Sequence, residues 1–319
     1  MGLNPYVFIV GCPRSGTTLV RRIVDAHPQI AITRAETHWI PELFRRSVGV
    51  TRDGHVTREL LETLSTHPTF VKLRIDPRSL EGLADERAKR SYAEFVTGIF
   101  DAYGRQEGKR LAGDKTPGYV RSIPTLHGLW PTARFVHVVR DGRDVGLSAV
   151  NWTRKAESFA RRYPTWAEDP VATAAFWWRW HVSIGRREGA RLGPGLYHEL
   201  RYEDLVRDPA AACRRLCAFL ELDYDDAMVR FHEGRQQRPD RDAKHAWLPI
   251  TAGLRDWRTD MPREDLERFE AAAGDLLDEL GYPRAIARLD PRRLADAERI
   301  GARFARKAPS ADRPLPDGW

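Results

Sequence analysis

The sequence predicts an α/β fold in which a mostly parallel sheet is flanked by helices on both faces. Short runs of β-branched and aromatic residues alternate with stretches of helical periodicity, which is typical of parallel sheets. A glycine-rich segment at residues 11–18 lies between the first such run and the first helical stretch. The chain has 319 residues, of which 42% are hydrophobic, so it can bury the core of one domain.

The first half of the chain supplies three predicted strands. Residues 6–10 form a β-branched and aromatic run that ends at a glycine. Residues 19–27 then follow helical spacing, and Pro28 closes that helix. Two further strands are predicted at residues 29–33 and 111–113.

The second half continues the alternation. The run at residues 134–139 is the clearest strand of all, and Asp141 can cap a helix that ends near residue 151. A tryptophan-rich helix is predicted at residues 170–191, and a further strand at 196–201. Amphipathic helices are predicted at residues 209–220 and 263–280.

We expect a single domain over residues 1–308. The segments near 34–110 and 152–170 interrupt the alternation and are interpreted as insertions around a site. Residues 309–319 are rich in proline and aspartate and are expected to form a flexible tail.

Composition argues against several classes of protein. Only seven of the 52 basic residues are lysines, and no basic run alternates with aromatics as in a nucleic-acid platform. No apolar run approaches the ~20 residues that span a bilayer. The residues before the first strand lack a basic region and a cleavage site, so we do not expect a signal peptide. Three cysteines favour a reducing compartment over a disulfide framework. We therefore expect a cytoplasmic protein that binds neither nucleic acid nor membrane.

Residues 11–18, Gly-Cys-Pro-Arg-Ser-Gly-Thr-Thr, have the spacing of a P-loop. Its glycines allow backbone N–H groups to converge on an anion at a helix N-terminus. Thr17 stands where a triphosphate-binding loop has its lysine. A triphosphate needs that lysine and Mg²⁺, whereas a terminal sulfonate carries one charge. Hydroxyls, amides and Arg14 could therefore hold a phosphosulfate without metal.

This loop resembles the phosphosulfate loop of sulfotransferases that use 3′-phosphoadenosine-5′-phosphosulfate (PAPS). Residues 11–28 are similar to the matching segment of tyrosylprotein sulfotransferases, and heparan sulfate sulfotransferases carry a related version. The resemblance implies the sulfotransferase fold, PAPS as donor, PAP as product, no metal and a hydroxyl-bearing acceptor. It implies the following donor-binding residues in the loop: Pro13, Arg14, Ser15, Gly16, Thr17 and Thr18.

A second donor-binding segment follows the strand at residues 134–139. Arg140 lies at the predicted carboxyl edge of the sheet, and Ser148 lies eight residues further on. Read alone, the run Arg-Asp-Gly-Arg-Asp that begins at Arg140 is equally a surface salt-bridge cluster. The resemblance implies instead that Arg140 and Ser148 bind the 3′-phosphate of the donor.

Glu36 is the candidate general base, with a surface glutamate at a helix start as the alternative. Tyrosylprotein sulfotransferases place a Glu-Thr pair here, although this chain has one extra residue between the loop and Glu36. The resemblance implies that Lys115 and Arg14 stabilise the leaving group. Pro117 stands where cytosolic small-molecule sulfotransferases have a catalytic histidine, which favours Glu36. His38 is the second candidate base.

Two weaker matches complete the candidate site. Tyr202 resembles a tyrosine that holds the nucleotide, and an ordinary half-buried tyrosine is the alternative. Arg258 resembles the basic residue of a segment that covers the adenosine and 3′-phosphate, but the glycine pair expected there is out of register. Trp177 and Trp180 are interpreted as core residues, with an acceptor pocket as the alternative.

The sequence therefore predicts a PAPS-dependent sulfotransferase. A P-loop kinase is the rival enzyme, and it would require the missing lysine. A non-catalytic PAP-binding regulator is the other rival, and Glu36 and Lys115 speak against it. The acceptor is a peptide tyrosine, a sugar or a natural-product alcohol, and the oligomeric state is left open, a homodimer included.

Overall fold

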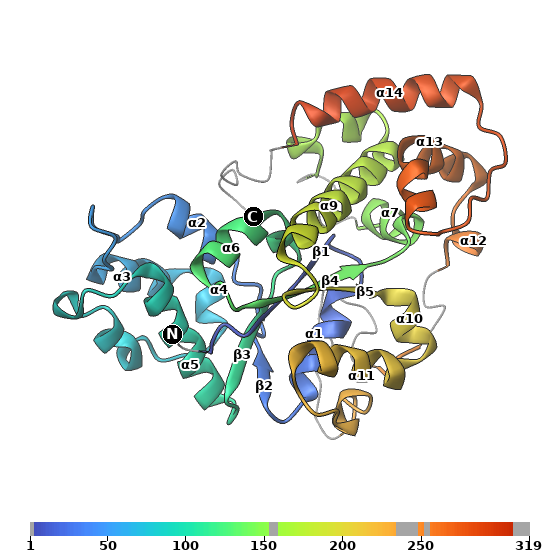
Figure 1. Ribbon diagram of the computed structural model, residues 1–319. Helices are drawn as coiled ribbons and strands as arrows, with labels where there is room; N and C mark the ends of the chain where they lie inside the picture. Colours follow the sequence, from blue (N-terminus) through green and yellow to red (C-terminus); the bar gives the residue numbers. More distant parts are fainter. Residues whose placement is uncertain (1–2, 153–158, 234–247, 252–255, 309–319) are drawn as a thin grey trace.

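The computed structural model describes residues 3–152, 159–233, 248–251 and 256–308. Within these residues the chain forms a five-stranded parallel sheet in the order β2-β3-β1-β4-β5 (Figure 1). The strands are β1 (Val7–Gly11), β2 (Ile30–Ile32), β3 (Leu111–Lys115), β4 (Arg134–Val139) and β5 (Tyr197–Arg201). The prediction of an α/β fold with a mostly parallel sheet is confirmed, and each strand lies close to its predicted position.

Helices fill the connections between the strands. They are α1 (Thr17–Ala26), α2 (Trp39–Arg45), α3 (Arg58–Thr66), α4 (Pro68–Val71), α5 (Tyr92–Gln106), α6 (Ile123–Leu129), α7 (Gly142–Val150), α9 (Pro170–Leu192), α10 (Tyr202–Arg207), α11 (Pro209–Leu220), α12 (Trp257–Asp260), α13 (Arg263–Glu279) and α14 (Pro291–Ala305). Short 3₁₀ turns lie at Pro77–Leu83, Glu86–Ala88, Pro117–Ser122, Pro164–Ala167 and Asp226–Met228.

The two faces of the sheet are covered by different helices. Successive residues of β1 point to opposite faces, so they belong to two different cores. Val7 and Ile9 belong to a core that α1 and α11 complete. Phe8 and Val10 belong to the core on the other face, where α5 and α6 pack. The long helix α9 crosses β1, β4 and β5 and contacts all three (Figure 1).

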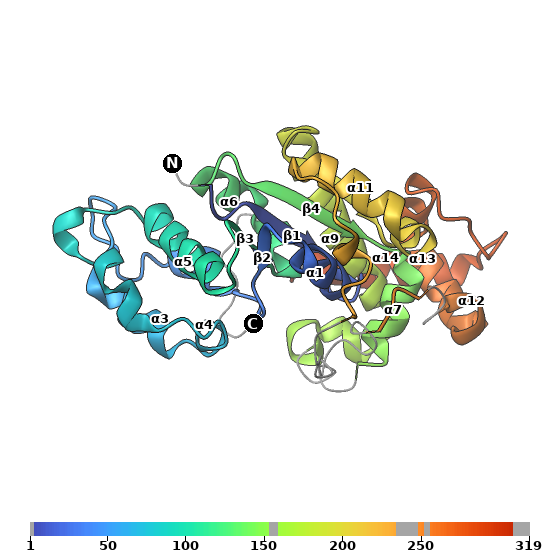
Figure 2. The same cartoon turned by 90° about the horizontal axis from the view of Figure 1, so that it is seen from below.

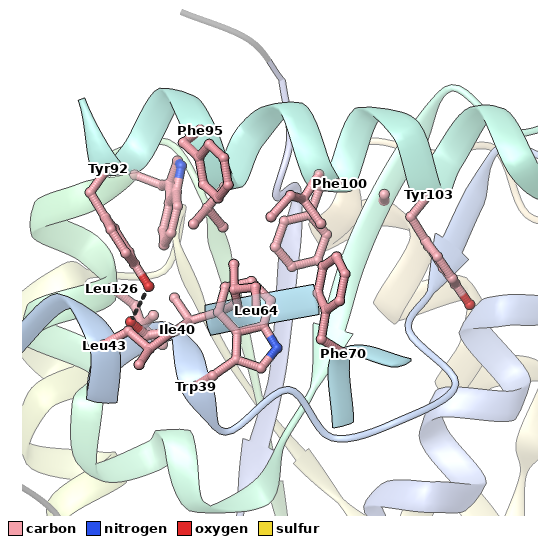
Figure 3. Packing of buried hydrophobic residues seen from close by; sticks show 14 of the residues in the cluster. Trp39, Ile40, Leu43, Leu64, Phe70, Tyr92, Phe95, Phe100, Tyr103 and Leu126 are labelled. Carbon is pink, nitrogen blue, oxygen red and sulfur yellow. Dashed lines mark hydrogen bonds between the residues drawn. The ribbon is translucent and has the colours of Figure 1, made fainter. Parts of the chain in front are cut away.

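Two groups of helices lie at opposite ends of the sheet (Figure 2). At one end α3, α4 and α5 surround a core that contains Trp39, Phe70 and Phe95 (Figure 3). At the other end α13 and α14 pack against α7 and α9 around Trp178 and Phe269. The segment 34–110, which the sequence marks as an insertion, is therefore mostly helical and extends the core on one side of the sheet.

Several details differ from the sequence prediction. Helix α1 begins at Thr17 rather than near residue 19, because Gly16 takes the N-cap position with a φ of 94°. Helix α13 contains a non-helical residue, Ala273. Helix α14 was not predicted, although Asp290 followed by a proline is an N-terminal signal.

Residues 153–158, in the second predicted insertion, and the predicted tail at 309–319 lie outside the described residues. The single-domain boundary at residue 308 therefore stays a prediction. Among the described residues, no helix is long and apolar enough to cross a bilayer.

A buried carboxyl group ties the ends of β2 and β3 together. Asp114 is fully buried in β3, and its Oδ1 accepts a hydrogen bond of 2.8 Å from Thr33 Oγ1, directly after β2. Burial raises the pKa of Asp114 to about 6, although hydrogen bonds from Thr116, Thr33 and Thr37 oppose the shift. The folded protein therefore favours the protonated acid more strongly than the unfolded chain does.

This raised pKa predicts a pH-dependent effect of Asp114→Asn. Between pH 4 and pH 7 the unfolded chain loses the Asp114 proton before the folded protein does, so the contribution of Asp114 to wild-type stability falls as pH rises. The amide cannot ionise, and the variant should gain about 2 kcal/mol relative to wild type over this range. Urea unfolding of both proteins at pH 4 and pH 7 measures this gain. A difference between them that does not change with pH would contradict the prediction.

Candidate active site

The candidate residues converge because all five strands end at the same edge of the sheet. The loop at residues 11–18 follows β1, Glu36 follows β2, and Lys115 is the last residue of β3. Arg140 follows β4, and Tyr202 follows β5. The strand order reverses beside β1, because β2 and β3 lie on one side of it and β4 and β5 lie on the other. Open α/β sheets bind their ligands at the carboxyl ends of the strands at such a point.

The loop after β1 needs its two glycines for close packing. A Cβ atom at Gly11 would lie 2.6 Å from the Val138 carbonyl oxygen, and one at Gly16 would lie 2.5 Å from Cδ2 of Tyr202. Between them, Ser15 is fully buried, and its Oγ has no hydrogen-bond partner among the described residues. A buried hydroxyl without a partner, beside the first amides of α1, fits an anionic ligand.

Glu36 and Lys115 form an ion pair beside this loop. Lys115 Nζ lies 2.5 Å from Glu36 Oε1 and 3.4 Å from the Oγ1 atom of Thr18. The other carboxylate oxygen, Oε2, lies 3.1 Å from Nε2 of His38. Burial opposes ionisation of Glu36, but the charges and hydrogen bonds of Lys115 and His38 outweigh it and lower its pKa to about 2. The site thus holds a carboxylate and a cation next to the anion-binding loop.

Arg140 is buried at the end of β4, as its predicted place at the sheet edge requires. Its guanidinium lies over the Tyr202 ring, with Cζ 4.2 Å from the ring centroid, and Nη2 donates to Asp144 Oδ2 at 3.0 Å. Its Nε has no hydrogen-bond partner among the described residues. A buried arginine with a spare donor, stacked on a tyrosine, can bind a phosphate.

Arg14 connects the loop to α7. Its Nε donates to Ser148 Oγ at 3.0 Å, and its Cζ lies 4.8 Å from the centroid of the Trp152 ring. The sequence assigned Ser148 to the same phosphate as Arg140. In the structure the Ser148 hydroxyl accepts this hydrogen bond from Arg14, so the loop and the second predicted donor-binding segment meet directly. The predicted contact of Ser148 with the 3′-phosphate stays a prediction.

A network of buried charges holds this second segment in place. Arg143 is fully buried, and it donates to Asp141 Oδ2 at 2.8 Å and to Glu270 Oε1 at 2.8 Å. Trp257 N donates to Asp144 Oδ1 at 2.9 Å. The run does contain internal salt bridges, Arg140–Asp144 and Arg143–Asp141, but its charged side chains are buried, so the interpretation as a surface cluster is wrong. Further partners come from α12 and α13, far along the chain.

Arg258 is not joined to the other candidate residues. Its side chain is 58% exposed, its Nη1 lies 3.4 Å from Asp256 Oδ1, and its guanidinium stacks on the ring of Trp257. None of these partners belongs to the loop at residues 11–18 or to the Glu36–Lys115 pair. The predicted donor contact of Arg258 stays a prediction.

Trp177 and His137 are core residues, whereas His38, the second candidate base, lies beside Glu36. Trp177 and Trp178 are buried, and Trp180 is partly buried against them. His137 is buried with its Nδ1 2.6 Å from the Tyr197 hydroxyl, and burial lowers its pKa to about 3. No group of three or more histidine, cysteine, aspartate or glutamate side chains among the described residues could hold a metal ion.

Comparison with known proteins identifies the family. The model of the sulfotransferase family matches residues 5–226 of this chain. Protein-tyrosine sulfotransferase 1 of Danio rerio is 27% identical over 93% of this chain and 79% of its own length. Protein-tyrosine sulfotransferase A of Caenorhabditis elegans is 24% identical over 96% of this chain and 76% of its own length. The human protein-tyrosine sulfotransferase 1 is 25% identical over 93% and 76%.

A comparison of folds also identifies a sulfotransferase. The solved sulfotransferase domain from the curacin biosynthetic pathway superposes with a TM-score of 0.56 at 20% identity and covers 89% of this chain and 99% of that domain. This likeness confirms the predicted sulfotransferase fold. The family match extends over most of the chain and includes the phosphate-type loop, Glu36, Lys115 and Arg140. The chain therefore belongs to the sulfotransferase family and is a sulfotransferase enzyme.

Proposed function

We propose that this enzyme transfers a sulfonate group from PAPS to a phenolic hydroxyl, with Glu36 as the general base. The observation that carries the proposal is the Glu36–Lys115 ion pair, which lies 3.4 Å from Thr18 in a phosphate-type loop without a lysine. This arrangement places a proton acceptor and a cation beside the loop where the family binds the phosphosulfate.

The proposed donor site spans the carboxyl edge of the sheet. The amides at the start of α1 and the Ser15 hydroxyl, which has no partner among the described residues, suit the 5′-phosphosulfate. The other residues that the sequence assigns to donor binding, Pro13, Arg14, Gly16, Thr17 and Thr18, belong to the same loop. Arg140, with its spare Nε donor, suits the 3′-phosphate, and the ring of Tyr202 stacks beneath its guanidinium.

The transfer needs one proton acceptor and one cation. Glu36 takes the proton of the acceptor hydroxyl as the new oxygen–sulfur bond forms. The bond from sulfur to the bridging oxygen breaks, and its electron pair stays on the 5′-phosphate of PAP. Lys115 lies within reach of Thr18 and stabilises the charge that develops on this oxygen, with Arg14 as the second cation.

The strength of the base favours a phenol over an alcohol. A carboxylate is a weak base, and a phenolic hydroxyl, with a pKa of about 10, gives up its proton far more readily than an alcohol. The curated relatives that this chain resembles include protein-tyrosine sulfotransferases, whose name describes a phenolic acceptor. A tyrosyl side chain is therefore the first acceptor to test. A cytoplasmic location and a homodimer remain predictions.

The first prediction concerns the two reacting groups. Glu36→Gln should lower kcat about 100- to 10,000-fold, because the amide accepts no proton. Lys115→Met should lower kcat about 100- to 1,000-fold, because the leaving oxygen loses its cation. PAP release from PAPS, with a tyrosine peptide as acceptor, measures both. Glu42→Gln, in the same segment and paired with Arg46, is the matched control and should keep wild-type turnover. Release of PAP by Glu36→Gln at the wild-type rate would exclude Glu36 as the base.

The second prediction separates the two arginines proposed for the 3′-phosphate. Arg140→Ala should weaken PAP binding about 10- to 100-fold, because a charged hydrogen bond is lost, and it should weaken 5′-AMP binding much less. Arg258→Ala should weaken PAP binding less than about threefold, because its side chain is exposed and lies against Trp257. Calorimetric titration with both nucleotides checks this. Equal losses of PAP affinity in the two variants would contradict this prediction and would support the donor contact that the sequence predicts for Arg258.

A further inference from the structure

The side chain of His38 contacts the proposed base. Its Nε2 lies 3.1 Å from Glu36 Oε2, while Lys115 Nζ occupies the other oxygen of the same carboxylate. An ionised carboxylate only accepts hydrogen bonds, so Nε2 of His38 carries the proton that is shared with Glu36. The base is therefore held from both sides, by a lysine and by an imidazole.

The backbone at His38 adopts a strained conformation to make this contact. His38 has a φ of 51° and a ψ of −40°, outside the regions that side chains other than glycine commonly adopt. Trp39 N donates to the Thr37 carbonyl oxygen at 2.5 Å, so His38 is the central residue of a γ-turn of the rare positive-φ type. Such strain persists only where the surrounding structure imposes it, and it is concentrated at functional sites.

The residues on both sides of His38 impose the turn. Thr37 N donates to Thr116 Oγ1 at 3.0 Å, and Thr37 Oγ1 lies 2.7 Å from the Tyr119 hydroxyl. On the other side, Trp39 is fully buried in the helical core, where it packs against Phe70 (Figure 3). With both neighbours fixed, the turn directs the imidazole to Glu36.

We propose that His38 is a positioning residue, which holds Glu36 in place when Lys115 turns to the leaving oxygen. The proposal rests on the proposed function, in which Lys115 serves the donor and Glu36 takes the proton of the acceptor. Once Lys115 moves away from Glu36, the contact with Nε2 of His38 is the one that remains to the Glu36 carboxylate among the described residues. It keeps one oxygen engaged and leaves the other free to face the acceptor.

Two substitutions separate a hydrogen bond from bulk. The amide nitrogen of glutamine reaches about as far from the backbone as Nε2 of histidine, whereas that of asparagine reaches only as far as Nδ1. His38→Asn should therefore lower kcat about 10- to 100-fold with little change in KM for PAPS, and His38→Gln should recover most of that loss. His67→Asn is the matched control, because Nδ1 of His67 accepts from Thr69 N and does not contact Glu36.

A third substitution separates positioning from stability. Glycine adopts positive φ without strain, so His38→Gly should unfold at or above the wild-type temperature and yet lose kcat as His38→Asn does. A merely structural role predicts the opposite, a lower melting temperature and a parallel loss of PAP affinity.

The experiment measures PAP release with a tyrosine peptide, calorimetric PAP affinity and the melting temperature for all of these variants and for Glu36→Gln. The expected result is a loss of kcat in His38→Asn and His38→Gly, recovery in His38→Gln, and unchanged PAP affinity. Wild-type turnover in His38→Asn or His38→Gly, or equal losses in His38→Asn and His38→Gln, overturns the positioning role. Wild-type turnover in Glu36→Gln instead overturns the proposed function itself, so the two failures are distinguishable.

Discussion

The ion pair between Lys115 and Glu36 is the contact on which the rest of the site depends. The two residues are 79 positions apart, and they meet because β2 and β3 pair in parallel, with Ile32 opposite Gly113. A buried lysine without a partner carries a large desolvation penalty, so Glu36 also fixes the segment that follows β2 against the sheet. In the proposed mechanism, the same contact holds the proposed base and the proposed leaving-group cation as a neutral pair until the substrates separate them.

The donor half of the site depends on a part of the chain that the family model does not match. The matched region ends at residue 226, yet Asp144 accepts from the backbone of Trp257, and Arg143 is paired with Glu270. Helix α7 is thereby fixed to α12 and α13. Because Asp144 also holds Arg140, the position of the proposed phosphate ligand is set by residues more than a hundred positions further along the chain.

The sequence could predict what depends on local pattern. The strands, the loop between β1 and α1, and the placement of Arg140 at a strand end all follow from short runs of residues. Even α5, which lies within the predicted insertion, begins with a capping box of Ser91 and Glu94, which is a local signal in the sequence. Helix α14 likewise begins at an Asp-Pro signal.

Contacts between distant segments could not be predicted. Nothing in the run from Arg140 to Asp144 shows that its charges are buried against α12 and α13 rather than exposed. The contact of Ser148 with Arg14 and the γ-turn at His38 depend on how separate elements pack. The resemblance named the reacting groups, but the structure supplied the distances between them and the partners that orient them.

The central claim is that Glu36, Lys115 and a lysine-free loop transfer a sulfonate to a phenol without a metal ion. The most direct test incubates the enzyme with ³⁵S-labelled PAPS and a tyrosine peptide in the presence of EDTA. Label should appear on the tyrosine, and one PAP should be released for each sulfonate transferred. Label that appears only as inorganic sulfate, or transfer that returns only when Mg²⁺ is added, would contradict the claim.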